Sequence, residues 1–246
     1  WNANDIYRII RIRADKINTV INAGEEAIEL TKDNSQTIDN YLSKPAMGLQ
    51  FPWAMYNEYF LGMRLGKLFL MGLTSNSGKS RNLMMLAAYV SLVKNIPFLF
   101  LSNEMSEEDL RSCLITTVVN NKVFQDIHMV YRNKPEKEIV LGVYHDEQGN
   151  IIRRKIDENG IYIESEDEYK QRVYKTKEYQ DILKVTQWID KSKSKLMFKD
   201  ICDDYSTERI EFELRKAKAI YNIQYYGFDT LKGYKTDDWS SVKLPV

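Results

Sequence analysis

The sequence is poor in the residues on which disulfide-linked and zinc-binding proteins depend. It contains 2 cysteines and 2 histidines among 246 residues. Cys113 and Cys202 cannot form a disulfide framework or a four-ligand zinc site, and such low cysteine use favours a reducing, cytoplasmic setting. His128 and His145 lie far apart in the sequence without a cysteine pattern beside them, so they do not suggest a metal site.

A long apolar run and an excess of charge are also missing. No run approaches the roughly 18–20 residues that cross a bilayer, which excludes a membrane-spanning protein. The 35 basic residues balance 35 acidic ones. Any binding of nucleic acid must therefore come from a local patch or an oligomeric channel. A hydrophobic content of 43% with 28% charged residues is typical of a globular chain.

The first segment, residues 1–45, is expected to form an N-terminal helical or linker segment, with helix over 5–45. Apolar residues recur there at steps of three and four, which places them in one stripe: Ile6, Ile9, Ile10, Ile17, Val20, Ile21 and Ile28. The stripe fits a helix that packs on its own domain, and equally a linker helix that docks on a neighbouring subunit. A second unit is expected over 46–246.

The second unit alternates strands with helices. Short apolar runs predict buried strands over 67–72, 97–102, 196–198 and 224–228, and helical periodicity predicts helices over 83–92, 106–119, 179–189 and from about 207. Ser106 followed by Asp109 suggests a capping box. This alternation predicts an α/β fold with a parallel sheet covered on both faces.

Residues 130–175 interrupt this alternation. We expect a β-hairpin insertion there, with strands over 138–144 and 151–153 around an Asp146–Asn150 turn, and a third strand over 160–163. Surface insertions add little loop entropy as they lengthen. The insertion is therefore expected to project from the core as a separate, solvated element, so that a short linker could replace residues 134–172.

A phosphate-binding loop is the strongest local signal. Its residues run from Thr74 through Ser75, Asn76, Ser77, Gly78 and Lys79 to Ser80, and Arg81 follows. Backbone N–H groups at a helix N-terminus bind phosphate, a lysine reaches the β- and γ-phosphates, and a serine hydroxyl binds Mg²⁺. Leu73 stands where the pattern asks for glycine. The loop predicts ATP and Mg²⁺ as ligands.

Two carboxylates are placed to complete such a site. Asp229 ends a predicted strand, where it can hold Mg²⁺ through a water shell, although any strand-terminal aspartate looks the same. Glu104 follows the second predicted strand, where it can polarise a water for attack on the γ-phosphate. The simpler reading of Glu104 is an acid that favours the dipole of the next helix.

Four ordered segments resemble the DnaB-type replicative helicases, which are hexameric RecA-fold ATPases of bacteria and phages. Residues 102–110 (SNEMSEEDL) resemble the family's S-L-E-M-S-x-E-x-L segment, and residues 62–68 its run before the first strand. Residues 196–200 with 206–210 are similar to its L-x-I-D-D…S-x-x-x-I passage, and residues 214–218 to its basic helix before the Walker B strand. The resemblance covers about 45–125 and 177–235.

The resemblance implies a RecA-like P-loop NTPase that forms a hexameric ring and moves on single-stranded DNA. It implies that Lys79 and Ser80 bind nucleotide and Mg²⁺, that Glu104 is the catalytic base and that Asp229 is the Walker B acid. A primase or a helicase loader is an implied partner. Asn103 replaces the family's usual leucine, and we match no arginine finger, sensor glutamine or DNA-contacting loop to this sequence.

A second class of function stays open. A RecA-like ATPase can act as a loader, a recombination mediator or a regulatory switch, with the insertion as its protein-interaction module. The formal charge of zero favours this class, because translocases commonly line their pore with cationic loops.

Overall fold

A computed structural model describes residues 29–74, 77–203 and 206–230. The chain divides into two compact units, residues 1–47 and 48–246. In the first unit, helix α2 (Asn34–Ser43) has no buried residue. This helix confirms the last part of the helix predicted over 5–45. The predicted apolar stripe from Ile6 to Ile28 lies outside the described residues.

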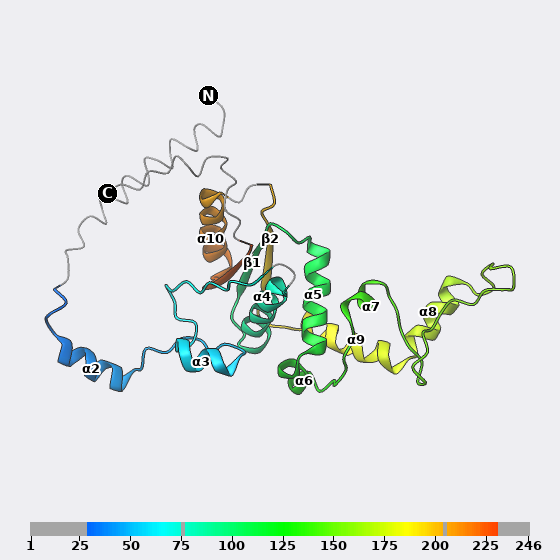
Figure 1. The fold of residues 1–246 in the computed structure, drawn as a ribbon, viewed down its shortest axis with the longest axis horizontal. Coiled ribbons are helices and arrows are strands. Elements are labelled where there is room, and N and C mark those ends of the chain that lie inside the picture. The colour runs from blue at the N-terminus through cyan, green and yellow to red at the C-terminus, as the bar shows by residue number, and fades with distance from the viewer. Residues whose placement is uncertain (1–28, 75–76, 204–205, 231–246) are drawn as a thin grey trace, which may run out of the picture. The chain divides into compact units, whose positions relative to one another are not determined.

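The second unit is built around a parallel sheet (Figure 1). Its strands are β1 (Phe98–Ser102), β2 (Leu196–Asp200) and β3 (Tyr225–Asp229), in the order β2-β1-β3. Both neighbours run parallel to β1, as the alternation of strands and helices predicts. The register places Ser102 beside Asp200 on one side and Asp229 on the other, so all three strands end at one edge.

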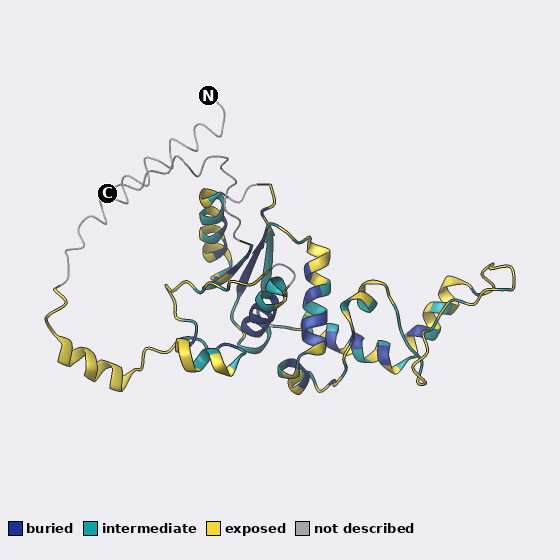
Figure 2. Ribbon diagram, in the orientation of Figure 1, coloured by how far each residue is buried: buried dark blue, intermediate teal, exposed yellow. Residues whose placement is uncertain are grey.

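Helices cover both faces of the sheet, which confirms the predicted α/β class. One face carries α4 (Lys79–Ala88) and α5 (Glu107–Asn120), and the other carries α10 (Thr207–Tyr221). Phe98 and Phe100 pack with Ala87 of α4, whereas the alternate residues Leu99 and Leu101 pack with Ala217 of α10. Every residue of β1 is buried, so this strand is the centre of the core (Figure 2).

The remaining helices of the core extend the α4–α5 side. Helix α4 continues into a π-helical turn, η1 (Tyr89–Val93), closed by a hydrogen bond from Lys94 N to Tyr89 O of 3.1 Å. Helices α6 (Lys122–His128) and α9 (Lys177–Asp190) join a second buried cluster with Val119, Phe124 and Val185. Helix α3 (Ala54–Phe60) precedes the sheet. No helix in the described ranges is long and apolar enough to cross a membrane.

The strand predicted over 67–72 is wrong. Within the described residues this segment pairs with no strand, and the side chains of Leu68 and Leu70 stay exposed. Phe69 is instead held in an aromatic cluster, with its ring centroid 5.1 Å from that of Phe51 and 5.4 Å from that of Phe60. The segment is therefore fixed by ring packing rather than by backbone hydrogen bonds to a neighbouring strand.

The insertion is also less β-rich than predicted. The expected strand over 138–144 begins as a helix, α7 (Glu136–Val140), which follows Pro135 at its N-cap. Two short hairpins come next, each with a single bridge, at His145–Ile151 and at Ile156–Tyr162. The predicted third strand over 160–163 is reduced to the second of these bridges. Helix α8 (Glu166–Tyr174) completes the insertion.

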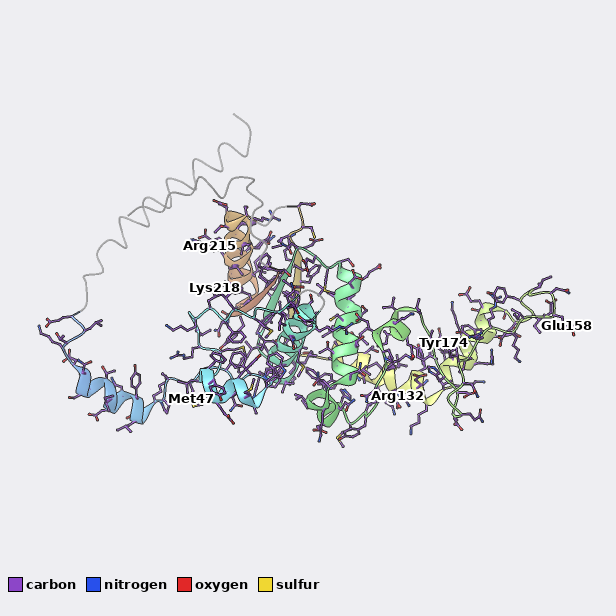
Figure 3. The ribbon with its side chains drawn as sticks, viewed as in Figure 1. Met47, Arg132, Glu158, Tyr174, Arg215 and Lys218 are labelled. Atoms are coloured by element: carbon purple, nitrogen blue, oxygen red, sulfur yellow. The ribbon has the colours of Figure 1, made fainter. Side chains whose placement is uncertain are left out.

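The two hairpins, which we call the hairpin arm (residues 144–163), repeat one turn. In the first, Asp146 Oδ1 accepts hydrogen bonds of 2.9 and 2.8 Å from the amides two and four residues later. In the second, Asp157 does the same at 2.9 and 2.8 Å. Gly149 and Gly160 take positive φ values of 85° and 80°, a region that glycine adopts without strain. Glu158 marks the second turn in Figure 3.

The base of the insertion does not project from the core, which corrects the prediction of a separate solvated element. Lys134 is 1% exposed, and Asn120 of α5 clamps its backbone with hydrogen bonds of 2.7 and 2.8 Å. Arg132 pairs with Asp181 of α9 at 2.8 Å (Figure 3). A linker in place of residues 134–172 would therefore remove part of the core. The two exposed turns that an aspartate and a glycine close lie in the hairpin arm.

Candidate functional site

The predicted phosphate loop leads into the N-terminus of α4. Ser75 and Asn76 lie outside the described residues, while Ser77 turns back on Thr74 through a hydrogen bond from its hydroxyl to Thr74 O of 2.5 Å. Gly78 is the N-cap of α4 in the left-handed region, with φ 87°, and no side chain caps the helix. The first N–H groups of a helix have no partner within it. Those of Lys79, Ser80 and Arg81 are therefore available to an anion.

Packing fixes the position of this helix end. Five consecutive residues of α4, from Met84 to Ala88, are buried. A Cβ atom at Gly227 of β3 would lie only 2.4 Å from Leu83 Cδ1, so the glycine allows α4 and β3 to approach closely. The sequence pattern places Gly227 two residues before Asp229. The helix that follows the predicted phosphate loop and the strand that carries Asp229 are thus packed directly against each other.

The carboxyl ends of β1 and β3 are tied together by side chains. Asn103 donates to Thr230 O at 3.1 Å and accepts from Thr230 N at 3.1 Å. Thr230 Oγ1 lies 3.2 Å from Glu104 Oε2 and 3.0 Å from Asp229 Oδ1. Ser102, which is fully buried, accepts from the amides of Glu104 and Met105 at 3.1 and 3.0 Å. These bonds hold Glu104 and Asp229 on adjacent strand ends.

A cavity of about 350 Å³ lies between these elements. It is lined by Gly78, Lys79, Ser80, Arg81, Glu104, Met105, Cys113 and Glu136. The structure therefore brings Gly78, Lys79, Ser80 and Arg81 to one space with Glu104. Asp229 is not among the lining residues; it is 3% exposed, and the Thr230 hydroxyl lies within hydrogen-bond distance of both its carboxylate and that of Glu104. Ser77 lies in the middle of the loop and is exposed.

The oxygen groups near this cavity fit a divalent cation of the Mg²⁺ type. Asp229 Oδ2 is buried and has no hydrogen-bond partner among the described residues, which is costly unless a cation or its water fills the role. The Ser80 hydroxyl, on the first turn of α4, is a second oxygen donor. Carboxylate and hydroxyl oxygens are the hard ligands that Mg²⁺ takes, usually with several waters.

The cavity wall also contains a thiol. Burial raises the pKa of Cys113; the Glu136 carboxylate raises it further, and the Arg81 guanidinium partly opposes the shift. Cys113 therefore stays a neutral thiol at physiological pH and acts as apolar lining rather than as a nucleophile.

A second group of titratable residues, from the insertion and α9, lies apart from the residues that line this cavity. One oxygen or nitrogen atom from each of Glu138, His145 and Glu178 falls within 4.8 Å of the others, the spacing of a metal site. Lys134 Nζ occupies this position, 2.9 Å from Glu178 Oε1 and 3.3 Å from Glu138 Oε2. The cation of the cluster is therefore the buried ammonium group.

Sequence reasoning missed three residues, of which Asn103 and Glu136 lie at the candidate site and Lys134 lies in the separate cluster with Glu138 and Glu178. Asn103 was visible only as a departure from the helicase segment that the sequence resembles, and its bonds with Thr230 depend on the register of β1 and β3. No local sequence pattern marks Glu136 as a site residue, because its partner Arg81 is 55 residues away in the sequence. Lys134 stands four residues before Glu138, a spacing common on any charged helix.

No protein-family model matches the chain, and no curated protein sequence matches it significantly.

Proposed function

We propose that the chain is a Mg²⁺-dependent P-loop ATPase with a RecA-like fold. The observation that carries the proposal is the uncapped N-terminus of α4, with Gly78 in the left-handed region and Lys79 beside it, facing Glu104 across one cavity. A helix N-terminus with a lysine binds phosphate, and an acid on the opposite wall can act on a water at that phosphate.

Each residue then has a distinct part. Lys79 neutralises charge on the β- and γ-phosphates, and the amides of α4 hold their oxygens. Glu104 takes the proton of the attacking water, and Thr230 orients its carboxylate by a contact of 3.2 Å. Ser80 and Asp229 would hold Mg²⁺. When bound, that ion offsets phosphate charge.

The helicase interpretation rests on the resemblance of four segments to DnaB-type enzymes. We propose accordingly that ATP hydrolysis moves a homohexameric ring along single-stranded DNA, with a primase or a loader as partner. The parallel three-stranded sheet with helices on both faces is compatible with that fold.

A regulatory switch or loader is the second candidate, and two observations favour it. The formal net charge is zero, and an insertion residue, Glu136, reaches the wall of the cavity. Such a contact can link nucleotide occupancy to a protein-interaction module.

The deciding experiment measures phosphate release from Mg-ATP with and without single-stranded DNA, for the natural chain and for Lys79→Ala. Hydrolysis that depends on Lys79 supports the ATPase proposal, and hydrolysis that persists in the variant overturns it. Stimulation by DNA together with ATP-driven strand displacement supports the helicase. Lys79-dependent hydrolysis that DNA leaves unchanged supports the switch.

A further inference from the structure

Glu136 is the residue by which the insertion reaches the candidate phosphate site. Its carboxylate forms an ion pair with Arg81 of α4, and its other oxygen accepts from the Ser112 hydroxyl of α5 at 3.0 Å. Both members of the ion pair line the cavity. The carboxylate therefore stands beside the helix end at which the phosphates of a nucleotide would bind.

The two side chains of this pair differ in their freedom to move. The Arg81 side chain is 56% exposed, whereas that of Glu136 is 20% exposed. Exposed ion pairs are weak because water screens them, while a guanidinium binds phosphate through two parallel, charge-assisted hydrogen bonds. A phosphate in the cavity is therefore the stronger partner for Arg81, and the arginine is the member free to turn.

Helix α7 depends on that pair more than a longer helix would. It has five residues, and isolated helices of this length are unstable. Glu136 holds its N-terminal end. The ammonium group of Lys134 donates to Glu138 within α7 and to Val143 O just beyond its C-terminus, and a bond of 2.9 Å to Glu178 fixes that ammonium group in place. Loss of the Arg81 contact leaves the Ser112 bond as the remaining described tie of the Glu136 side chain.

We propose that Glu136 competes with the nucleotide's phosphates for Arg81, so that binding of a triphosphate transfers Arg81 from the insertion to the nucleotide and loosens α7. Glu136 is a positioning residue in this scheme, because it acts through Arg81. The inference rests on the proposed nucleotide site. It adds a route by which occupancy of that site reaches the hairpin arm, which follows α7 directly.

The test compares amide hydrogen exchange of the natural chain with and without Mg²⁺ and a non-hydrolysable ATP analogue. We expect the analogue to slow exchange at the start of α4 and to speed exchange several-fold over residues 136–143. In Arg81→Ala the analogue should no longer change exchange over 136–143. Slowed exchange in α4 with unchanged exchange over 136–143 overturns this inference and leaves the proposed site intact. No change in either segment overturns both.

The affinity of the chain for an ATP analogue provides an independent test. A purely structural role of Glu136 would not make its replacement tighten binding. Glu136→Gln removes the competing charge but keeps the bond with Ser112, so it should bind a fluorescent ATP analogue on the order of tenfold more tightly. Glu147→Gln, in an exposed turn of the hairpin arm, makes the same chemical change away from the cavity and should bind as the natural chain does. Unchanged or weaker binding in Glu136→Gln contradicts the competition.

Discussion

Asn103 and Thr230 exchange two hydrogen bonds of 3.1 Å across the ends of two parallel strands. The amide side chain of Asn103 thereby satisfies both backbone groups of the residue that follows Asp229. Asn103 precedes Glu104 and bonds the residue that follows Asp229. It therefore holds the two proposed catalytic carboxylates in place, although it carries no charge itself.

Replacement of Asn103 by alanine should therefore lower both stability and turnover. Two lost side-chain bonds, each contributing about 0.5–1.5 kcal/mol, predict a decrease in the free energy of unfolding of about 1–3 kcal/mol. Urea denaturation and phosphate release measure the two effects. Asn159→Ala, in the exposed second turn, is the matched control. Equal stability of the two variants would show that the Asn103 bonds contribute nothing.

Lys79→Ala should abolish ATP hydrolysis and weaken binding of the triphosphate, because it removes the positive charge next to the uncapped amides of α4. Fluorescence titration with an ATP analogue and a phosphate-release assay measure the two losses. Lys175→Ala removes an exposed lysine beyond the cavity and should leave both values unchanged. Normal turnover in the Lys79 variant would contradict the phosphate-loop assignment.

Glu104→Gln keeps the size of the side chain but removes its basicity. ATP should still bind, while hydrolysis falls by a factor on the order of 10² or more. Glu108→Gln in the first turn of α5 tests the simpler reading, in which an acid serves only the helix dipole. If the two variants hydrolyse ATP at the same rate, Glu104 is a helix-dipole acid and not the base.

Lys134→Met should destabilise the second unit by about 3–5 kcal/mol, because it leaves the Glu138 and Glu178 carboxylates without their buried cation. Lys137→Met, at an exposed position of the neighbouring helix α7, is the control and should change stability little. The free energy of unfolding in urea separates the two. A loss no larger than that of the control would show that water satisfies the two carboxylates.

The same cluster predicts a dependence of stability on pH. Burial alone would raise the pKa of Glu178, but hydrogen bonds from Lys134 and the His145 amide outweigh it and lower the pKa. The unfolded chain then binds more protons, so the stabilisation is complete above the unfolded pKa of about 4.3 and is lost as pH falls through the folded value. Glu178→Gln should differ most from the natural chain near neutral pH. A stability difference that does not shrink in acid contradicts this linkage.

The sequence predicted the elements whose signals are local. Strands β1, β2 and β3 lie in short apolar runs, and Ser106 caps α5 in the expected capping box with Asp109. These patterns identify an element without knowledge of its neighbours. The parallel arrangement followed from the helices between the strands.

The failures occurred where a distant partner decides the local structure. The 67–72 run has the composition of a strand, yet the rings around Phe69 determine its conformation. The 138–144 run has β-forming residues, yet it begins as a helix. Lys134 binds α9 just before this helix, and Glu136 at its start binds α4 and α5. At the candidate site, Gly78, Lys79, Ser80 and Glu104 were recognisable by motif. The Asn103–Thr230 pair and the Arg81–Glu136 pair depend on contacts that no local pattern contains.

The repeated turn of the hairpin arm has a consequence for how this region can vary between related chains. Each turn is closed by its own aspartate and glycine, so each hairpin sets its register without help from the other. A copy of the unit could be gained or lost during evolution while the flanking segments keep their pairing. Length variation in descendants of this sequence should therefore concentrate in the arm and occur in whole repeats, whereas α7, which is tied to α4 and α5, keeps its length.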